Sequence, residues 1–192
     1  MSHIGKLIIV VAPSGSGKGT LIDHIKKTFG DEIKYPVSCT TRVMRPEEID
    51  GNVYHFISRE EFKKRIDRHY FLEWAEYSGN LYGTPKKDIL DHIAQGDMVL
   101  REVEIQGAQA IKKTMNASEL VIIYVDAGSW KDLEKRIESR APLSEKELEL
   151  RHRRFLKEIE FKVSADYVVS NKDGEIDEAK KNIIEIIRQL QN

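Results

Sequence analysis

The sequence predicts an α/β fold of the three-layer α/β/α type, with a parallel central sheet covered by helices on both faces. Short apolar runs that suit buried strands alternate with amphipathic segments that suit helices. Residues 120–125 are continuously apolar, as expected of a strand covered on both faces. Residues 7–11 form another such run, and a Gly/Ser-rich turn and a helical pattern follow it, which is the context of a phosphate-binding loop (P-loop).

The predicted P-loop occupies residues 10–20, VVAPSGSGKGT. Its glycines let backbone amides approach anionic oxygens at the start of a helix, and Lys18 adds a point charge. Ala12 replaces the first glycine of the common pattern, and the hydroxyl is displaced to Thr20, as in many nucleoside monophosphate kinases. A turn that binds nothing is the alternative. The residues predicted to bind a nucleoside triphosphate are Ala12, Pro13, Ser14, Gly15, Ser16, Gly17, Lys18, Gly19 and Thr20.

The first half of the chain carries turn and cap signals between its apolar runs. The first helix is expected to end near Phe29, with Gly30 after it. Residues 35–39 and 53–57 are β-like runs, and Ser58 with Glu61 predicts a capping box. A polar and aromatic stretch, 71–83, leads to Thr84-Pro85, which we interpret as the N-cap and first residue of a helix that stops at Gly96.

The second half returns to a regular alternation of strands and helices. A strand at 98–103 becomes charged towards its end, and the apolar run at 120–125 follows. Ser129 and Ser144 each precede an acidic residue at capping-box spacing, which predicts two helices. Residues 167–169 are expected to form the last strand, and a single apolar stripe predicts a final helix through Leu190. Residues 35–84 interrupt this alternation of strands and helices with short β-like runs, which predicts an inserted lobe.

Composition limits the classes of function. A chain of 192 residues suits one domain, and a formal charge of −1 favours neither nucleic acid nor an anionic membrane. The lone Cys39 excludes a disulfide framework, and the six histidines show no metal-ligand spacing. The first predicted strand begins close to the N-terminus and no apolar run is long enough to span a membrane, so we expect a cytoplasmic protein without a secretory signal. A monomer and a homodimer both remain open.

Two groups of basic residues accompany the P-loop. Phosphoryl transfer brings two anions together, so a kinase needs cations beyond its P-loop lysine. Arg42 and Arg45 lie in a Thr/Pro-rich segment. Arg136 and Arg140 share one helix face ahead of Arg151. Any one of these arginines alone is more often part of a solvated face.

Together these segments resemble the guanylate kinase family over roughly residues 6–187. The resemblance rests on the P-loop and on six further stretches, which are 37–45 (VSCTTRVMR), 50–56 (DGNVYHF), 71–75 (FLEWA), 78–84 (SGNLYGT), 103–107 (VEIQG) and the spacing of Arg136, Arg140 and Arg151. It implies a P-loop core of residues 1–34, 85–136 and 157–192. It also implies a GMP-binding lobe at 35–84 and a helical lid at 137–156.

The resemblance also implies residue roles. Residues at the guanine base would be Ser38, Glu73 and Thr84, with Glu104 nearby; the GMP phosphate would be held by Arg42, Arg45, Tyr54 and Tyr82. Residues around the transferred phosphoryl group would be Lys18, Arg42, Arg136, Arg140 and Arg151, and Asn171 would lie near the adenine of ATP. Mg²⁺ would accompany ATP, with Thr20, Glu102 and Glu104 reaching it through water.

The implied activity is transfer of the γ-phosphoryl group of ATP to GMP, and to dGMP. The family usually has an apolar residue at Arg101, an aspartate at Glu104 and a glycine at Ala141. Arg101 either pairs with Glu102 or Glu104 or extends into solvent. These departures leave open a kinase for another phosphorylated acceptor. A non-catalytic guanylate-kinase-like binding module is the remaining alternative, although such modules tend to lose the P-loop lysine and lid arginines.

Overall fold

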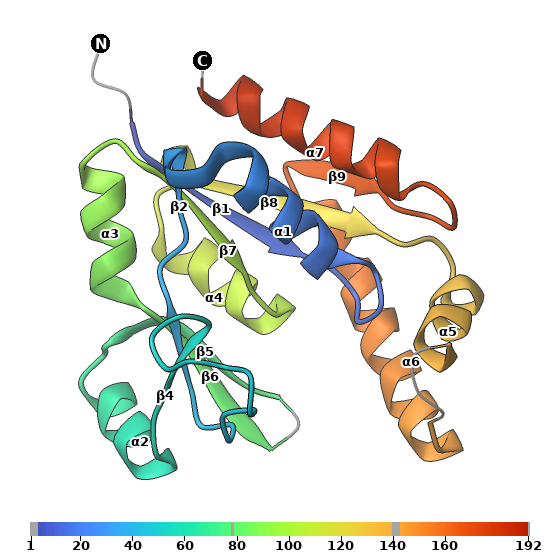
Figure 1. Ribbon diagram of the computed structural model, residues 1–192, viewed down its shortest axis with the longest axis horizontal. Coiled ribbons are helices and arrows are strands. Elements are labelled where there is room, and N and C mark those ends of the chain that lie inside the picture. Colours follow the sequence, from blue (N-terminus) through green and yellow to red (C-terminus); the bar gives the residue numbers. More distant parts are fainter. Residues whose placement is uncertain (1–3, 78, 140–142, 192) are drawn as a thin grey trace. The chain divides into compact units, whose positions relative to one another are not determined.

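The computed structural model describes residues 4–77, 79–139 and 143–191 of the chain (Figure 1). The chain divides into two compact units. Unit 1 comprises Met1–Ile8 and Ile33–Leu120, and unit 2 comprises Ile9–Glu32 and Val121–Asn192. The predicted GMP-binding lobe falls inside unit 1 and the predicted lid inside unit 2, and their predicted boundaries stay predictions.

A five-stranded sheet has the strand order β2-β7-β1-β8-β9. Its strands are β1 (Lys6–Val11), β2 (Ile33–Lys34), β7 (Met98–Glu102), β8 (Leu120–Asp126) and β9 (Tyr167–Ser170). The pairs β2–β7 and β8–β9 are parallel, which confirms the predicted parallel sheet. All residues of β8 before Asp126 are buried, as its continuous apolar pattern predicts.

Unit 1 contains a second sheet of strand order β4-β3-β6-β5. These strands are β3 (Ser38–Thr40), β4 (Tyr54–Phe56), β5 (Phe71–Tyr77) and β6 (Asn80–Pro85). Its helices are α2 (Arg59–Asp67), α3 (Lys86–Ala94), α4 (Ile105–Thr114) and the short η2 (Ala117–Glu119). A small core of Cys39, Phe62, Phe71 and Leu81 packs beneath this sheet.

Unit 2 contains the P-loop helix α1 (Lys18–Phe29) and the C-terminal helix α7 (Ile176–Gln191), which lie side by side (Figure 1). Its other helices are η1 (Gly30–Glu32), α5 (Trp130–Glu138), α6 (Glu145–Glu160) and η3 (Phe161–Ser164). Ser129 and Ser144 both form the capping boxes that their spacing predicts. Helix α1 ends at Phe29 with Gly30 as its cap, also as predicted.

Two of the local predictions are wrong, for identifiable reasons. Thr84 is not a helix cap: it lies in β6 and its hydroxyl bonds Glu73, so α3 begins at Lys86 after Pro85. Residues 35–39 are not one strand, because β2 ends before them and β3 begins at Ser38. Pro36, which has no N–H group for a strand ladder, lies in the gap.

Candidate functional site

The P-loop lies between the end of β1 at Val11 and the start of α1 at Lys18. Gly17 is the N-cap of α1 with φ 84°, a left-handed conformation that glycine adopts readily, and no side chain caps this helix end. The uncapped N–H groups therefore point toward the loop, where they suit a phosphate. Within the described part of the chain, the buried Ser16 hydroxyl has no hydrogen-bond partner, so it also remains available to a ligand.

Three predicted residues of unit 2 connect to this loop. Asn171 is buried, and its Nδ2 donates to the Ser16 carbonyl oxygen at 2.6 Å. Arg136 Nη1 donates to the Asn171 carbonyl oxygen at 2.9 Å. Arg151 Nη1 donates to Ser14 Oγ at 2.9 Å. The structure thus brings these residues to the P-loop, while Arg140 lies outside the described residues.

In unit 1, the three residues predicted at the guanine base form one buried cluster. Glu73 and Thr84 face each other across the β5–β6 pair, so their side chains share a face of the sheet. Thr84 Oγ1 donates to Glu73 Oε1 at 2.6 Å and lies 3.4 Å from Ser38 Oγ. All three side chains are buried. The structure therefore joins residues from three separate stretches of the sequence.

Glu73 is an unusual carboxylate because it is only 9% exposed. Burial is the main influence on the Glu73 pKa and raises it; Glu104 also raises it, whereas the Thr84 hydrogen bond and the Arg101 charge lower it. A buried carboxylate with one oxygen already accepting a hydrogen bond is costly unless the other oxygen also finds donors. Glu73 is therefore suited to a ligand that offers N–H groups.

Gly107, at the start of α4, sets the space available to Glu73. A Cβ atom at this position would lie 2.5 Å from Glu73 Oε2. The sequence suggested only that Gln106-Gly107 belongs to a family motif, and it did not predict α4. The glycine allows the helix to approach the carboxylate closely.

If the ligand at Glu73 is the GMP that the sequence resemblance implies, replacing Gly107 with alanine is expected to displace Glu73 and raise KM for GMP by about tenfold or more, since overpacking costs roughly 1–3 kcal/mol. The KM for ATP should change little, because Gly107 and Glu73 both belong to unit 1. Steady-state kinetics with each nucleotide varied would measure both constants. Gln109→Ala, on the exposed face of the same helix, is the control; an unchanged KM for GMP in Gly107→Ala would contradict this packing argument.

The two arginines predicted to bind the GMP phosphate surround an internal carboxylate. Arg42 contacts Glu48 with both Nη atoms, at 2.9 and 2.6 Å, and the backbone N–H of Arg45 donates to Glu48 at 2.8 Å. These contacts lower the Glu48 pKa and raise the Arg42 pKa. Sequence reasoning missed Glu48, although its position three residues after Arg45 in the same short segment was the available signal.

Tyr54 and Tyr82 complete the predicted phosphate-binding group. Their ring centroids lie 5.8 Å apart, and the Arg42 guanidinium carbon lies 5.7 Å from the Tyr54 ring centroid. Burial raises the Tyr54 pKa, so its hydroxyl stays protonated as a neutral donor. The Arg42 guanidinium therefore already binds a carboxylate, Glu48, with both Nη atoms, as it could bind two oxygens of a phosphate.

Glu102 ends β7 and is half-buried, whereas Glu104 is the exposed N-cap of α4 and makes no side-chain cap hydrogen bond. Among the described residues, no three acidic, histidine or cysteine side chains form a group that could hold a metal ion.

Arg101 differs from both sequence expectations, because it neither extends into solvent nor pairs with Glu102 or Glu104. Its side chain is buried and donates to the Pro36 carbonyl oxygen and to Ser38 Oγ. Its guanidinium carbon lies 4.8 Å from the Tyr35 ring centroid. The strand pairing of β2 with β7 brings the 35–38 segment to this arginine.

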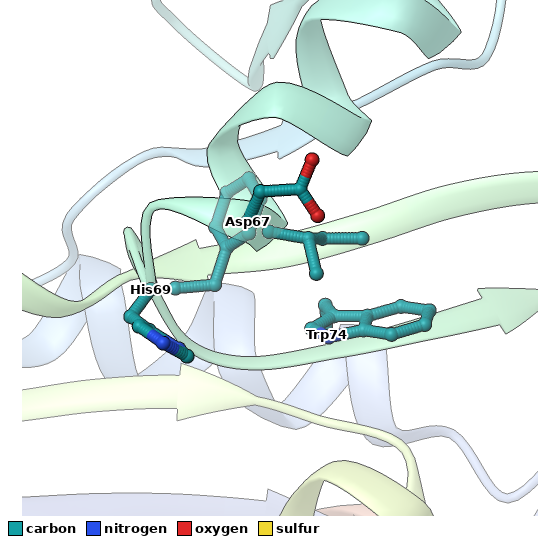
Figure 2. A pocket seen from close by; sticks show the side chains of 5 residues that line it. Asp67, His69 and Trp74 are labelled. Carbon is teal, nitrogen blue, oxygen red and sulfur yellow. The ribbon is translucent and has the colours of Figure 1, made fainter.

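A surface pocket of about 390 Å³ is lined by Trp74 of β5 and by Asp67 and His69 near the end of α2 (Figure 2). Trp74, the neighbour of Glu73, points into this pocket because successive strand side chains face opposite ways. Its lining contains none of the predicted site residues and consists of Ile66, Asp67, His69, Phe71 and Trp74.

No described helix is long and apolar enough to cross a membrane.

Comparison with known proteins gives one consistent result. Residues 4–190 match the family model described as guanylate kinase. The guanylate kinase of Rubrobacter xylanophilus is 40% identical over 186 residues, covering 97% of this chain and 95% of the relative. That of Thermotoga maritima is 39% identical over 184 residues, covering 96% and 86%. A crystal structure of guanylate kinase from Anaplasma phagocytophilum has a TM-score of 0.75 at 27% identity, covering 98% of this chain and 87% of that one.

Proposed function

The chain belongs to the guanylate kinase family, and we propose on that basis that it transfers the γ-phosphoryl group of ATP to GMP. The products are ADP and GDP. The single observation that best supports GMP as the acceptor is the buried Glu73 carboxylate beside Thr84 and Ser38. We further propose dGMP as an acceptor and a cytoplasmic location.

We assign the ATP site to unit 2. The backbone N–H groups at the start of α1 and the Ser16 hydroxyl would bind phosphate oxygens, and Lys18 would neutralise the outer phosphates. Arg136 and Arg151, which contact Asn171 and Ser14, would add charge around the transferred group. Arg140 has the same proposed role from its position in the sequence.

We assign the GMP site to unit 1. Guanine presents two donors on one edge, N1–H and the 2-amino group, and an ionised carboxylate can accept both. Glu73 supplies that carboxylate in a buried setting, with Glu104 as a second acid nearby. The GMP phosphate would replace Glu48 at the Arg42 guanidinium, because a guanidinium binds two phosphate oxygens as it binds two carboxylate oxygens. Arg45 and the Tyr54 and Tyr82 hydroxyls would complete the phosphate site.

The chemistry needs little from the protein beyond positioning and charge. The acceptor oxygen belongs to a phosphate that is already anionic, so no general base is required. Lys18 and the arginines would hold the two phosphates in line and neutralise the charge that spreads over the transferred group. Exclusion of water would favour transfer to GMP over hydrolysis.

Mg²⁺ is expected to enter with ATP, and its chemistry is neutralisation of charge on the phosphate oxygens. The proposed donors are hydroxyl and carboxylate oxygens, which are the ligand type that Mg²⁺ prefers. The Thr20 hydroxyl, in the first turn of α1, and the Glu102 and Glu104 carboxylates are the side chains we propose to contact the hydrated ion.

An acceptor panel tests the proposal and its alternatives. ADP release would be measured with Mg-ATP and each of GMP, dGMP, AMP, CMP and UMP at equal concentration. We expect GMP and dGMP to be good acceptors and the other three to be poor by about 10³-fold or more, because buried polar pairing rejects mismatched analogues strongly. Preference for another phosphorylated compound would favour the rival kinase, and GMP binding without ADP release would favour the non-catalytic module.

The two groups of arginines should have separable kinetic effects. Arg136→Ala is expected mainly to lower kcat, by about 10²-fold, because the Arg136 charge stabilises the transition state of phosphoryl transfer more than the bound substrates. Arg45→Ala is expected mainly to raise KM for GMP. Separate titrations of ATP and GMP would measure this split, and an Arg136→Ala protein that fails only in GMP binding would contradict the assignment of the two sites.

A further inference from the structure

Arg101 is a buried cation that the reaction as proposed does not use. It is 5% exposed, and among the described residues its guanidinium donates to the Pro36 carbonyl oxygen and to Ser38 Oγ. Its Nε has no partner among the described residues. A buried guanidinium with an unsatisfied donor is expensive, so a purely structural role would be better filled by an apolar side chain.

Arg101 begins a series of hydrogen bonds that ends at Glu73. Arg101 donates to Ser38 Oγ, Ser38 Oγ lies 3.4 Å from Thr84 Oγ1, and Thr84 Oγ1 donates to Glu73 Oε1 at 2.6 Å. The middle contact is the longest and therefore the weakest of the three. All four side chains are buried in unit 1.

The number of protons fixes the direction of this series. A guanidinium only donates, and each hydroxyl has one proton. The Thr84 hydroxyl uses its one proton to donate a hydrogen bond to Glu73. In the contact between Ser38 and Thr84, Ser38 must therefore be the donor. If Glu73 were protonated and donated instead, Ser38 would accept from both sides and its own proton would need another acceptor. The arrangement therefore requires an acceptor oxygen at its end, and an ionised carboxylate is a stronger acceptor than a neutral carboxyl group.

We propose that Arg101 is a positioning residue for guanine recognition, which anchors a one-directional hydrogen-bond relay through Ser38 and Thr84 and so holds Glu73 ionised and oriented. This inference rests on the proposed function for the identity of the ligand. Arg101 need not touch the nucleotide, since it acts through the carboxylate that does.

Electrostatics act in the same direction as the relay. The charged groups that influence Glu73 are Arg101 on β7, which lowers its pKa, and Glu104 at the start of α4, which raises it; burial, the largest influence, also raises it. Without the Arg101 charge, the Glu73 pKa rises further above its ordinary value. The carboxyl group then stays neutral to a higher pH, and a neutral carboxyl cannot accept both guanine donors.

The test compares three substitutions at one position. Arg101→Met removes the charge and the hydrogen-bond donors, and Arg101→Gln keeps a donor without the charge. Arg101→Lys keeps the charge but lacks the planar set of N–H donors of a guanidinium group. The measurements are the GMP dissociation constant without ATP, and kcat/KM for GMP, each across pH from mildly acidic to mildly alkaline. GMP's own ionisation is common to all proteins and cancels in the comparison. Arg59→Met, which loses an exposed arginine paired with Glu76 in the same unit, is the control.

We expect Arg101→Met and Arg101→Gln to bind GMP roughly tenfold more weakly below neutral pH, with the acidic limb of both profiles moved to higher pH. The loss should shrink at alkaline pH, the Arg101→Lys limb should stay near that of the parent, and KM for ATP should be unchanged throughout. Unfolding midpoints verify the fold of each variant; if the methionine variant does not fold, the glutamine variant carries the same test.

The inference would be overturned if the methionine or glutamine variant bound GMP as tightly as the parent protein and had the same pH profiles. A uniform loss for ATP and GMP at every pH would also overturn it, since that indicates a structural role. The proposed function fails separately, if the parent protein binds GMP and does not phosphorylate it; the relay is then still tested by the binding profiles.

Discussion

Replacing Lys18 with methionine is expected to lower kcat by about 10³-fold or more, ~4 kcal/mol of transition-state stabilisation. Lys18 opens α1 at the uncapped end of the helix, where the P-loop glycines bring backbone N–H groups toward a phosphate. The lysine charge would neutralise the outer phosphates of ATP during transfer. Methionine has a similar length and lacks the charge, so the loop geometry should persist.

The matched control is Lys27→Met, which removes an exposed lysine from the last turn of the same helix. It should keep the parent kcat, and both variants should keep the parent affinity for GMP, whose proposed site is in unit 1. Single-turnover and steady-state measurements of ADP release would supply the rates. A Lys18→Met protein with more than about a tenth of the parent kcat, a loss below ~1.4 kcal/mol, would show that this lysine is not catalytic.

Replacing Glu73 with glutamine is expected to lower kcat/KM for GMP by about 10²-fold or more. The buried carboxylate accepts a hydrogen bond from the Thr84 hydroxyl and would accept hydrogen bonds from the N1–H and 2-amino donors of guanine. A glutamine amide turns one acceptor into a donor, so a guanine donor would meet an N–H₂ group in a buried site. Because guanine recognition relies on the ionised form, kcat/KM for GMP in the parent should also fall as the pH drops through the raised Glu73 pKa.

Glu76→Gln is the control for this substitution, since Glu76 lies on the same strand with a 51% exposed side chain paired with Arg59. It should behave like the parent with every nucleotide. Initial rates over a range of GMP concentrations would separate KM from kcat. If Glu73→Gln phosphorylated GMP as well as the parent does, Glu73 would have no role in guanine recognition, and Glu104 would become the residue to examine.

The P-loop and the parallel sheet could be predicted because local sequence signals determine them. The apolar strand before residue 12, the loop glycines and the helix that begins at Lys18 all indicate the same strand–loop–helix motif. Ser129 and Ser144 likewise carry their capping boxes within four residues of sequence. The β5–β6 pair was not predicted, because a half-buried strand is recognised by alternating apolar and polar residues. Glu73 is buried in β5, so a charged residue occupies a position where this alternation requires an apolar one.

Contacts between distant residues could not be predicted in the same way. The Arg101–Ser38 hydrogen bond depends on where β7 and the segment after β2 meet, and no local pattern encodes it. Helix α4 was missed because Gly107 weakens its helical signal, and that glycine is explained only by the Glu73 carboxylate beside it. The Glu48 carboxylate likewise looks like an ordinary loop residue until Arg42 is seen to bind it.

Label transfer tests the central proposal most directly, because ADP release alone does not separate phosphoryl transfer from ATP hydrolysis. The parent protein would be incubated with Mg²⁺, GMP and ATP carrying a label in its γ-phosphate, and the nucleotides would be separated. The account predicts that the label appears in GDP in step with ADP formation and that little appears as inorganic phosphate. Label found mainly in inorganic phosphate, or retained in ATP while GMP remains bound, would contradict it.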